Sequence, residues 1–148
     1  MNIKKKTFVL HNVIQLQKTM NKDDFGQLAL LLRAAIIEKG LYPTSPVIYQ
    51  KEVLDEDSCR YTMYVAVDQA VKLSSQDVIS YLPSLEYEQG LCIRHLSDDN
   101  DFDSDEWLLE ECARSNHLVL IKPFFHIMMN VYGDAITDIY APIKGEKI

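Results

Sequence analysis

Apolar and polar positions in the first half of the chain follow the periods of a strand, a helix and two more strands. A period-two run rich in β-branched residues is followed by apolar positions at helical spacing, with Asn21 or Asp23 as the expected N-cap. Gly40 ends this run because glycine adopts the left-handed conformation of a helix stop. The predicted elements are a strand at residues 7–17, a helix at 23–39, and strands at 47–52 and 60–67 joined by an acidic turn.

The second half shows the same order of patterns. Asp103 and Glu106 stand at capping-box positions for a helix, and Gly133-Asp134 separates two alternating runs as a hairpin turn. The predicted elements are a strand at 85–95, a helix at 105–115, and strands at 124–132 and 135–143. Residues 68–83 form a connector whose apolar positions fit either a short helix or a strand.

These patterns predict a single α+β domain, residues 1–148, built from two β-α-β-β units. The units would be residues 1–67 and 84–148, with the connector 68–83 between them. We expect the strands to form one antiparallel sheet with both helices on one face, because each helix must bury its apolar stripe. The other face of the sheet would then be available for function.

Composition is that of an ordinary folded protein and excludes several function classes. With 148 residues, 47% of them hydrophobic and 25% charged, the chain can bury a core, and neither disorder nor a membrane span fits. A net charge of −7 argues against direct binding to nucleic acid or anionic membranes, which requires a surplus of Lys and Arg. Three cysteines without a Cys-x-x-Cys motif fit reduced thiols. No apolar signal region follows the lysines at positions 4–6, so a cytoplasmic location is expected.

Several short segments carry a resemblance to a known family. They are Glu38-Lys39-Gly40-Leu41, Pro46-Val47-Ile48-Tyr49, residues 59–67, residues 123–129 and residues 138–143. Together they resemble the effector-binding domains of multidrug-responsive bacterial regulators and the stand-alone gyrase-inhibitor-like proteins, which have a duplicated β-α-β-β fold. No helix-turn-helix region precedes these segments, so the chain looks like a stand-alone member. More narrowly, it is similar to small uncharacterised proteins encoded beside LXG toxins of type VII secretion.

The resemblance implies a small, often cationic or aromatic ligand in a cleft between the two repeats, with aromatic walls and a buried acid. The acid's position, early in the strand before the final hairpin turn, looks like His126 in this chain. Histidine does not carry the negative charge that a lipophilic cation needs. This departure favours an apolar or aromatic ligand, and it weakens the hydrolase activity that some relatives of the family have.

Aromatic residues of the predicted strands are the candidate walls, because rings give flat apolar surface and tyrosine hydroxyls orient a ligand. In the strand 124–132 the odd-numbered positions 125–131 are wholly apolar and are expected to meet the helices. The even-numbered positions should therefore face the cleft. Glu86 and Glu88 are substitute acids on the neighbouring strand. The candidate ligand-binding residues are Tyr49, Tyr64, Glu86, Phe124, His126, Met128 and Tyr140, and no catalytic residue is identified.

No metal or cofactor is expected. Asp99, Asp101, Asp103 and Glu110 have the spacing of EF-hand calcium ligands, but Ser104 stands where that loop requires glycine. Acids before a helix are explained by capping and by the helix dipole. Cys92 and His95 would point to opposite faces of a strand, which argues against zinc.

The first helix has a second apolar stripe, opposite the one that should face the core. It consists of Leu30, Ala34, Ile37 and Leu41. Such a stripe must be covered, either by the connector or by a partner, which would be a second copy of the chain or another protein.

Three functions follow from these observations. The first, which we favour, is a non-enzymatic domain that binds an apolar or aromatic small molecule, with His126 setting the ligand's orientation. The second is an interaction protein, such as an accessory of a bacterial toxin or secretion locus. The third is a hydrolase of reactive small molecules.

Overall fold

The computed structural model describes residues 2–74, 76–96, 99 and 101–145. The fold is α+β: within these residues there are two α-helices, a short 3-10 helix and six strands with antiparallel pairing. The elements are β1 (Ile3–Asn21), η1 (Lys22–Asp24), α1 (Phe25–Glu38), β2 (Val47–Val53), β3 (Ser58–Ala66), β4 (Ser80–Arg94), α2 (Asp103–Ser115), β5 (Phe125–Val131) and β6 (Asp134–Pro142). Neither α-helix among them is long and apolar enough to cross a membrane.

The chain divides into two compact units. Unit 1 consists of Met1–Val9 and Glu86–Ile148, and unit 2 consists of Leu10–Leu85. Both β1 and β4 therefore contribute residues to each unit. In chain order, α1 and the hairpin β2–β3 belong to unit 2, and α2 and the hairpin β5–β6 belong to unit 1.

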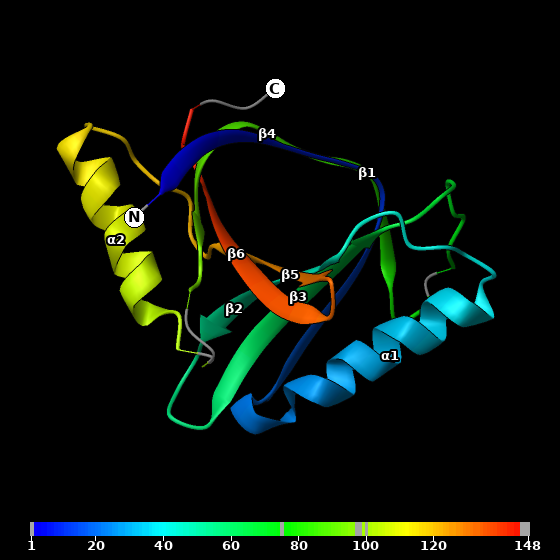
Figure 1. Ribbon diagram of the computed structural model, residues 1–148. Coiled ribbons are helices and arrows are strands. Elements are labelled where there is room, and N and C mark those ends of the chain that lie inside the picture. Colours follow the sequence, from blue (N-terminus) through cyan, green and yellow to red (C-terminus); the bar gives the residue numbers. More distant parts are fainter. Residues whose placement is uncertain (1, 75, 97–98, 100, 146–148) are drawn as a thin grey trace. The chain divides into compact units, whose positions relative to one another are not determined.

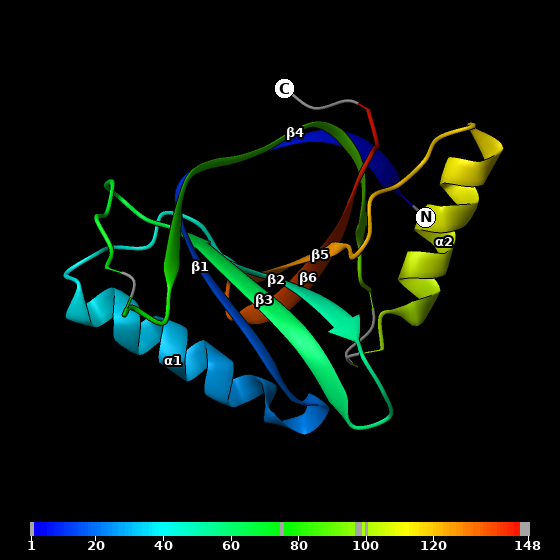
Figure 2. The same cartoon turned by 180° about the vertical axis from the view of Figure 1, so that it is seen from behind.

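Unit 2 is a three-stranded antiparallel sheet covered by α1. The central strand is β3, which pairs with β1 over residues 13–21 and with β2 over residues 48–53. Figure 2 shows β3 between the other two strands. The acidic turn after β2 is held by Asp55, whose Oδ1 accepts hydrogen bonds of 2.9 Å from the amides of Asp57 and Ser58. The predicted turn is thus confirmed.

Helix α1 packs on one face of this sheet through Leu28, Leu32 and Ile36. Figure 1 shows the helix lying along β1 and β3, and the side chains that meet it are Ile14, Leu16, Cys59, Tyr61, Met63 and Val65. The helix starts later than predicted because η1 occupies the preceding turn, so its N-cap is Asp24, which makes no side-chain cap hydrogen bond. Neither Asn21 nor Asp23 is the cap.

The C-terminal end of α1 lies where it was predicted. It also shows that one residue was wrongly assigned to the second apolar stripe of this helix. Gly40 has a φ of +69°, and the amide of Leu41 donates to the carbonyl of Ile36 over 3.1 Å. This Schellman arrangement turns Leu41 back onto the core, where it is 7% exposed. Leu41 is therefore a core residue and does not belong to the stripe. Leu30 and Ile37 remain 66% and 65% exposed.

The connector does not cover this stripe. Val71, Leu73 and Ile79 pack against the same core as the buried face of α1. From Ser80 onward the connector is already β4, so a strand is correct for its last residues.

The sheet strands of unit 1 are also antiparallel, and β6 is central among them. It pairs with β4 over residues 138–142 and with β5 over residues 134–140. The hairpin between β5 and β6 is confirmed, but its turn lies one residue earlier than the predicted Gly133-Asp134: Val131 faces Asp134, and the two loop residues Tyr132 and Gly133 have φ values of +53° and +90°. Positive φ at both loop positions is what a type I′ turn requires.

Helix α2 covers one face of this sheet through Leu109 and Ala113. The buried residues that pack with them are Leu91, Ile93, Phe124, Ile139, Ala141 and Ile143. The helix begins at Asp103 after Phe102 as N-cap, with no side-chain cap hydrogen bond, so the predicted capping box is wrong. The acids Asp103, Asp105 and Glu106 lie in the first turn, where the helix dipole stabilises them as expected.

The two faces of β5 are the reverse of the prediction. Phe124 packs in the core under α2, and Nε2 of His126 lies 3.5 Å from Oε2 of Glu106 on that helix. Phe125 points to the other face and stacks on Phe8 with 5.1 Å between ring centroids. The prediction that side chains alternate between two faces was correct, but the face assigned to the helix was not. His126 is 5% exposed and lies beside Glu106 and Phe102 on the α2 side.

Candidate functional site: a charged hollow in unit 1

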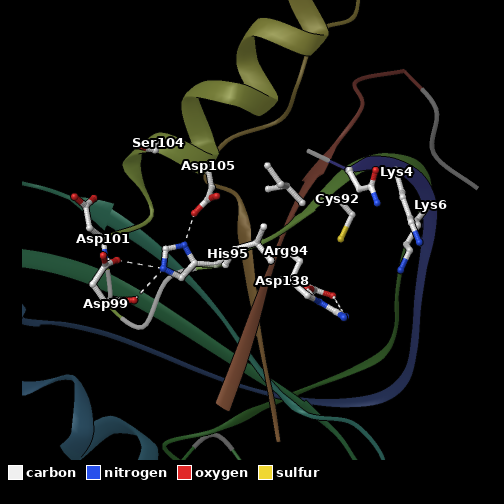
Figure 3. Close-up of a pocket in the computed structure, with 13 residues that line it drawn as sticks. Lys4, Lys6, Cys92, Arg94, His95, Asp99, Asp101, Ser104, Asp105 and Asp138 are labelled. Carbon is white, nitrogen blue, oxygen red and sulfur yellow. Dashed lines mark hydrogen bonds and ion pairs between the residues drawn. The ribbon is translucent and has the colours of Figure 1, made fainter. Parts of the chain in front are cut away.

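An open hollow of about 700 Å³ lies in unit 1 at the end of β4. This volume is in the range of small-molecule sites. Its walls come from the start of β1, from β4 and β6, and from the segment that leads into α2 (Figure 3). The lining residues are Asn2, Lys4, Lys6, Cys92, Ile93, Arg94, His95, Leu96, Asp99, Asp101, Ser104, Asp105 and Asp138.

A bidentate ion pair lies at one end of the hollow. Arg94 and Asp138 are register partners on β4 and β6, so their side chains share the sheet face that points away from α2. Arg94 Nε donates to Asp138 Oδ1 over 2.8 Å, and Nη2 donates to Oδ2 over 3.2 Å. The Asp138 side chain is 9% exposed and that of Arg94 is 52% exposed. The hydrogen bonds and charge of Asp138 raise the pKa of Arg94. The buried carboxylate thus holds the guanidinium in place.

Lys4, Lys6 and Cys92 line the same end (Figure 3). Lys4 and Lys6 are two residues apart on β1, both are exposed, and neither has an ion pair within the part of the chain that the structure describes. Cys92 is 6% exposed. Burial and then the charge of Asp138 raise the pKa of its thiol, while the charges of Lys6, Arg94 and Lys4 oppose that rise. The thiol is therefore protonated and a poor nucleophile.

The opposite end of the hollow is organised by His95. Its Nδ1 bonds to Oδ2 of Asp105, and its Nε2 lies 2.9 Å from the carbonyl oxygen of Asp99 and 3.2 Å from Oδ1 of the same residue. Burial opposes protonation of this side chain, which is 8% exposed, but the bonds to Asp105 and Asp99 raise its pKa overall. Both ring nitrogens face oxygen acceptors, an arrangement that favours the doubly protonated, positively charged imidazole. His95 thus ties the end of β4 to the first turn of α2.

A cluster of four rings adjoins the hollow on the same sheet face. Tyr140 and Phe125 are register partners, and Phe8 lies 5.0 Å and 5.1 Å from their ring centroids. Tyr87 completes the cluster at 5.8 Å from Phe125. Cys92, which lines the hollow, is the register partner of Tyr140 on β4. On this face of unit 1 the pair Cys92–Tyr140, at the ring cluster, is therefore followed directly by the charged pair Arg94–Asp138.

The structure separates the residues predicted from the sequence. Tyr140 belongs to the ring cluster, and its buried hydroxyl donates to the carbonyl of Lys6 over 2.7 Å. Phe124 and His126 face α2, and Met128, the register partner of Thr137, is half-buried on that same side. Glu86 is half-buried on β4, and Glu88 is exposed.

Tyr49 and Tyr64 lie in unit 2, and both contact residues of that unit. The ring of Tyr49 is 4.8 Å from that of Phe25, and the hydroxyl of Tyr64 donates to Oε1 of Gln50 over 2.6 Å. The lining of the hollow contains no residue of the predicted ligand-binding set, among the residues whose placement is described.

Sequence reasoning missed Arg94, Asp138 and the two lysines. One signal for Asp138 was present in the sequence. Asp138 and Tyr140 are two residues apart in a predicted strand, so their side chains must lie on the same face. Arg94 carries no local signal, because its partner is 44 residues away in the chain.

Comparison with known proteins places this architecture in a family. A family described as a domain of unknown function, DUF5085, matches residues 9–146. The chain belongs to the DUF5085 family. No curated protein matches it.

Solved structures share the fold of this DUF5085 chain at low sequence identity. The C-terminal domain of EcmrR is 12% identical with a TM-score of 0.70, and the match covers 97% of this chain and 99% of that one. A hydrolase from Listeria innocua is 10% identical with a TM-score of 0.64, covering 95% and 92% of the two chains. SAV2435, solved with tetraphenylphosphonium bound, is 14% identical with a TM-score of 0.53, covering 98% and 95%. The likeness extends over nearly the whole chain and is one of fold.

Proposed function

We propose that this DUF5085 chain is a non-enzymatic small-molecule-binding domain of the stand-alone, gyrase-inhibitor-like effector-binding type. Its ligand has an apolar or aromatic body and a charged group. In this proposal the strand, helix and hairpin found in each unit are two β-α-β-β repeats of one domain. The likeness to the EcmrR domain and to SAV2435, which binds tetraphenylphosphonium, supports the fold type on which the proposal is based.

A single observation carries the proposal. An open hollow of about 700 Å³ has an anchored ion pair, Arg94–Asp138, on the same sheet face as the ring cluster that includes Tyr140. Apolar surface next to a few convergent polar groups is the usual composition of a ligand site. The ligand's charged group lies at the ion pair, and its body packs on the lining beside Cys92, the register partner of the buried Tyr140. Of the residues predicted from the sequence, the proposal keeps Tyr140 and replaces His126 by Arg94 and Asp138.

Binding is favoured over hydrolysis because the reactive residue types at the hollow are not activated. Burial holds the Cys92 thiol in its protonated form. His95 has both ring nitrogens bonded to Asp99 and Asp105, so it is not poised to accept a proton from a substrate or water.

A binding panel tests this function. We expect at least one aromatic compound from a set that includes tetraphenylphosphonium and naphthalene derivatives to raise the melting temperature and to shift the amide NMR signals of residues 92–94. Asp138→Asn should weaken that binding, whereas Asp134→Asn, a matched change at an exposed position of β6, should not. A panel with no binder, or signals that shift only around Tyr49 and Tyr64, would contradict the proposal.

An interaction protein is the second candidate, favoured by the exposed apolar stripe of α1. Leu30 and Ile37 of this stripe are 66% and 65% exposed, and the adjacent Leu31 is 43% exposed. The partner is a second copy of the chain or a polypeptide of a toxin or secretion locus. Sedimentation equilibrium would reveal a dimer that the double variant Leu30→Lys, Ile37→Lys abolishes. Co-expression with an LXG polypeptide, with the same double variant as control, tests the other partner.

A further inference from the structure

We infer that the charged group of the ligand is an anion, a carboxylate or a phosphate, and that Arg94, Lys4 and Lys6 hold it. The inference rests on the proposed function, because it requires that the hollow bind a small molecule. The proposed function requires a charged group on the ligand but does not give the sign of that charge.

Arg94 is oriented as a receptor for an anion. Asp138 engages the Nε and Nη2 side of the guanidinium, and Nη1 has no partner within the described residues. A guanidinium is planar and has five N–H groups, so the donors that Asp138 leaves unused point away from it in a fixed direction. Because Asp138 is buried and Arg94 is half-exposed, this unused edge is the accessible one.

The balance of charge at this end of the hollow is positive. Arg94 and Asp138 neutralise each other, which leaves Lys4 and Lys6 as the net charge. Lys4, Lys6 and Arg94 all line the hollow on the side of Cys92, so their three positive charges lie at the same end (Figure 3). A cationic ligand would have to displace Arg94 from Asp138 and approach both lysines, whereas an anion meets three donors without breaking the pair.

The other end of the hollow orients such a ligand. Asp99 and Asp105 bind His95, and Asp101 accepts a hydrogen bond of 3.1 Å from the amide of Asp103. These carboxylates repel an anion, so its charged group is directed to the lysine end. The ligand class therefore differs in sign from tetraphenylphosphonium, the cation bound to SAV2435.

Matched naphthalene probes test the sign of the charge. The probes are 2-naphthoate, 2-naphthyl phosphate, 2-naphthamide and 2-naphthylmethylammonium, and dissociation constants are measured by calorimetry with NMR mapping of the site. We expect the better anion to bind at least about tenfold more tightly than the amide, and the ammonium to bind most weakly. The carboxylate and phosphate arms decide which anion fits. Added salt should weaken binding of the anion more than binding of the amide.

Variants assign the effect to the three cations. Arg94→Gln and the double variant Lys4→Ala, Lys6→Ala should each remove most of the preference for the anion. Lys5→Ala is the matched control, because Lys5 is exposed on the same strand and does not line the hollow. The lysine variants keep the test valid if the Arg94 variant folds poorly, since both lysines are exposed.

The outcomes separate this inference from the proposed function. If the amide or the ammonium binds in the hollow as tightly as the anions, the inference is overturned and the binding function stands. A loss caused equally by Lys5→Ala would also overturn it. If no probe binds at residues 92–94, the proposed function fails and the inference fails with it.

Discussion

The ring of Tyr140 lies directly against the backbone of Gly90, where a Cβ atom would come within 2.3 Å of its Cζ. The same ring packs on Phe8, and its hydroxyl donates to the carbonyl of Lys6. Tyr140 thus connects β4, β6 and the start of β1, the strands that carry Arg94, Asp138 and the lysines. The position of the ring therefore affects the wall of the hollow.

Gly90→Ala should destabilise the protein by about 1–3 kcal/mol, because the added methyl group forces the ring of Tyr140 or the backbone to move. Urea unfolding measures this change. Gly26→Ala is the control: nothing lies within 4 Å of its added Cβ, so its stability should be unchanged or raised by up to about 1 kcal/mol. Equal effects of the two substitutions would show that the Tyr140–Gly90 contact is not tight.

Arg94→Ala should cost about 1–3 kcal/mol near neutral pH, because the buried carboxylate of Asp138 loses its partner. Asp138→Asn should cost less, since the half-exposed Arg94 can turn to water. Chemical unfolding of both variants gives the comparison. Arg114→Ala removes an exposed pair with Glu111 and should cost no more than about 1 kcal/mol. A larger loss for Asp138→Asn than for Arg94→Ala would contradict the burial assigned to Asp138.

His95 should make stability depend on pH. Its pKa is raised in the folded state, so its contribution is complete below the ordinary histidine pKa of about 6.5 and is lost as pH rises through the folded value. The free energy of unfolding of the wild type, minus that of His95→Gln, should therefore fall as pH increases from about 5 to 9. His11→Gln, the same substitution at an exposed position on β1, is the matched control. A difference that grows with pH would reverse the assignment.

Leu32 and Leu30 are two residues apart on α1 and should respond differently to truncation. Leu32 is 1% exposed in the core of unit 2, so Leu32→Ala should cost about 2–5 kcal/mol. Leu30 is 66% exposed, so Leu30→Ala should change stability by no more than about 0.5 kcal/mol. Thermal or urea unfolding distinguishes the two. A substantial loss for Leu30→Ala at high protein concentration only would instead reveal a second copy of the chain on this stripe.

Local patterns predicted the elements well where the physics is local. Gly40 and Gly133 end their elements because positive φ values suit glycine, and the alternation in β5 and β6 follows from strand geometry. The helix caps were wrong because a suitable side chain is common near a helix start. An N-cap must also lie directly before the first helical turn. In α1 the 3-10 helix η1 moves the start to Phe25, and in α2 the residue at this position is Phe102.

The site was less predictable because its contacts join distant parts of the chain. Asp138 resembles an exposed acid in the sequence, and only its register with Arg94 makes its burial stable. Alternation in β5 divides Phe124 and His126 from Phe125 but does not say which set faces a helix. In the structure α2 packs on the face that carries Phe124 and His126.

The amino-acid sequence alone determined that this chain is α+β, where its turns lie and which residues share a strand face, since each depends on neighbours a few positions apart. The tertiary structure alone decided which face meets α2, that Arg94 and Asp138 pair, and that Lys4 and Lys6 stand beside them. Those outcomes depend on strand register and on burial, which arise only when segments far apart in the chain pack together.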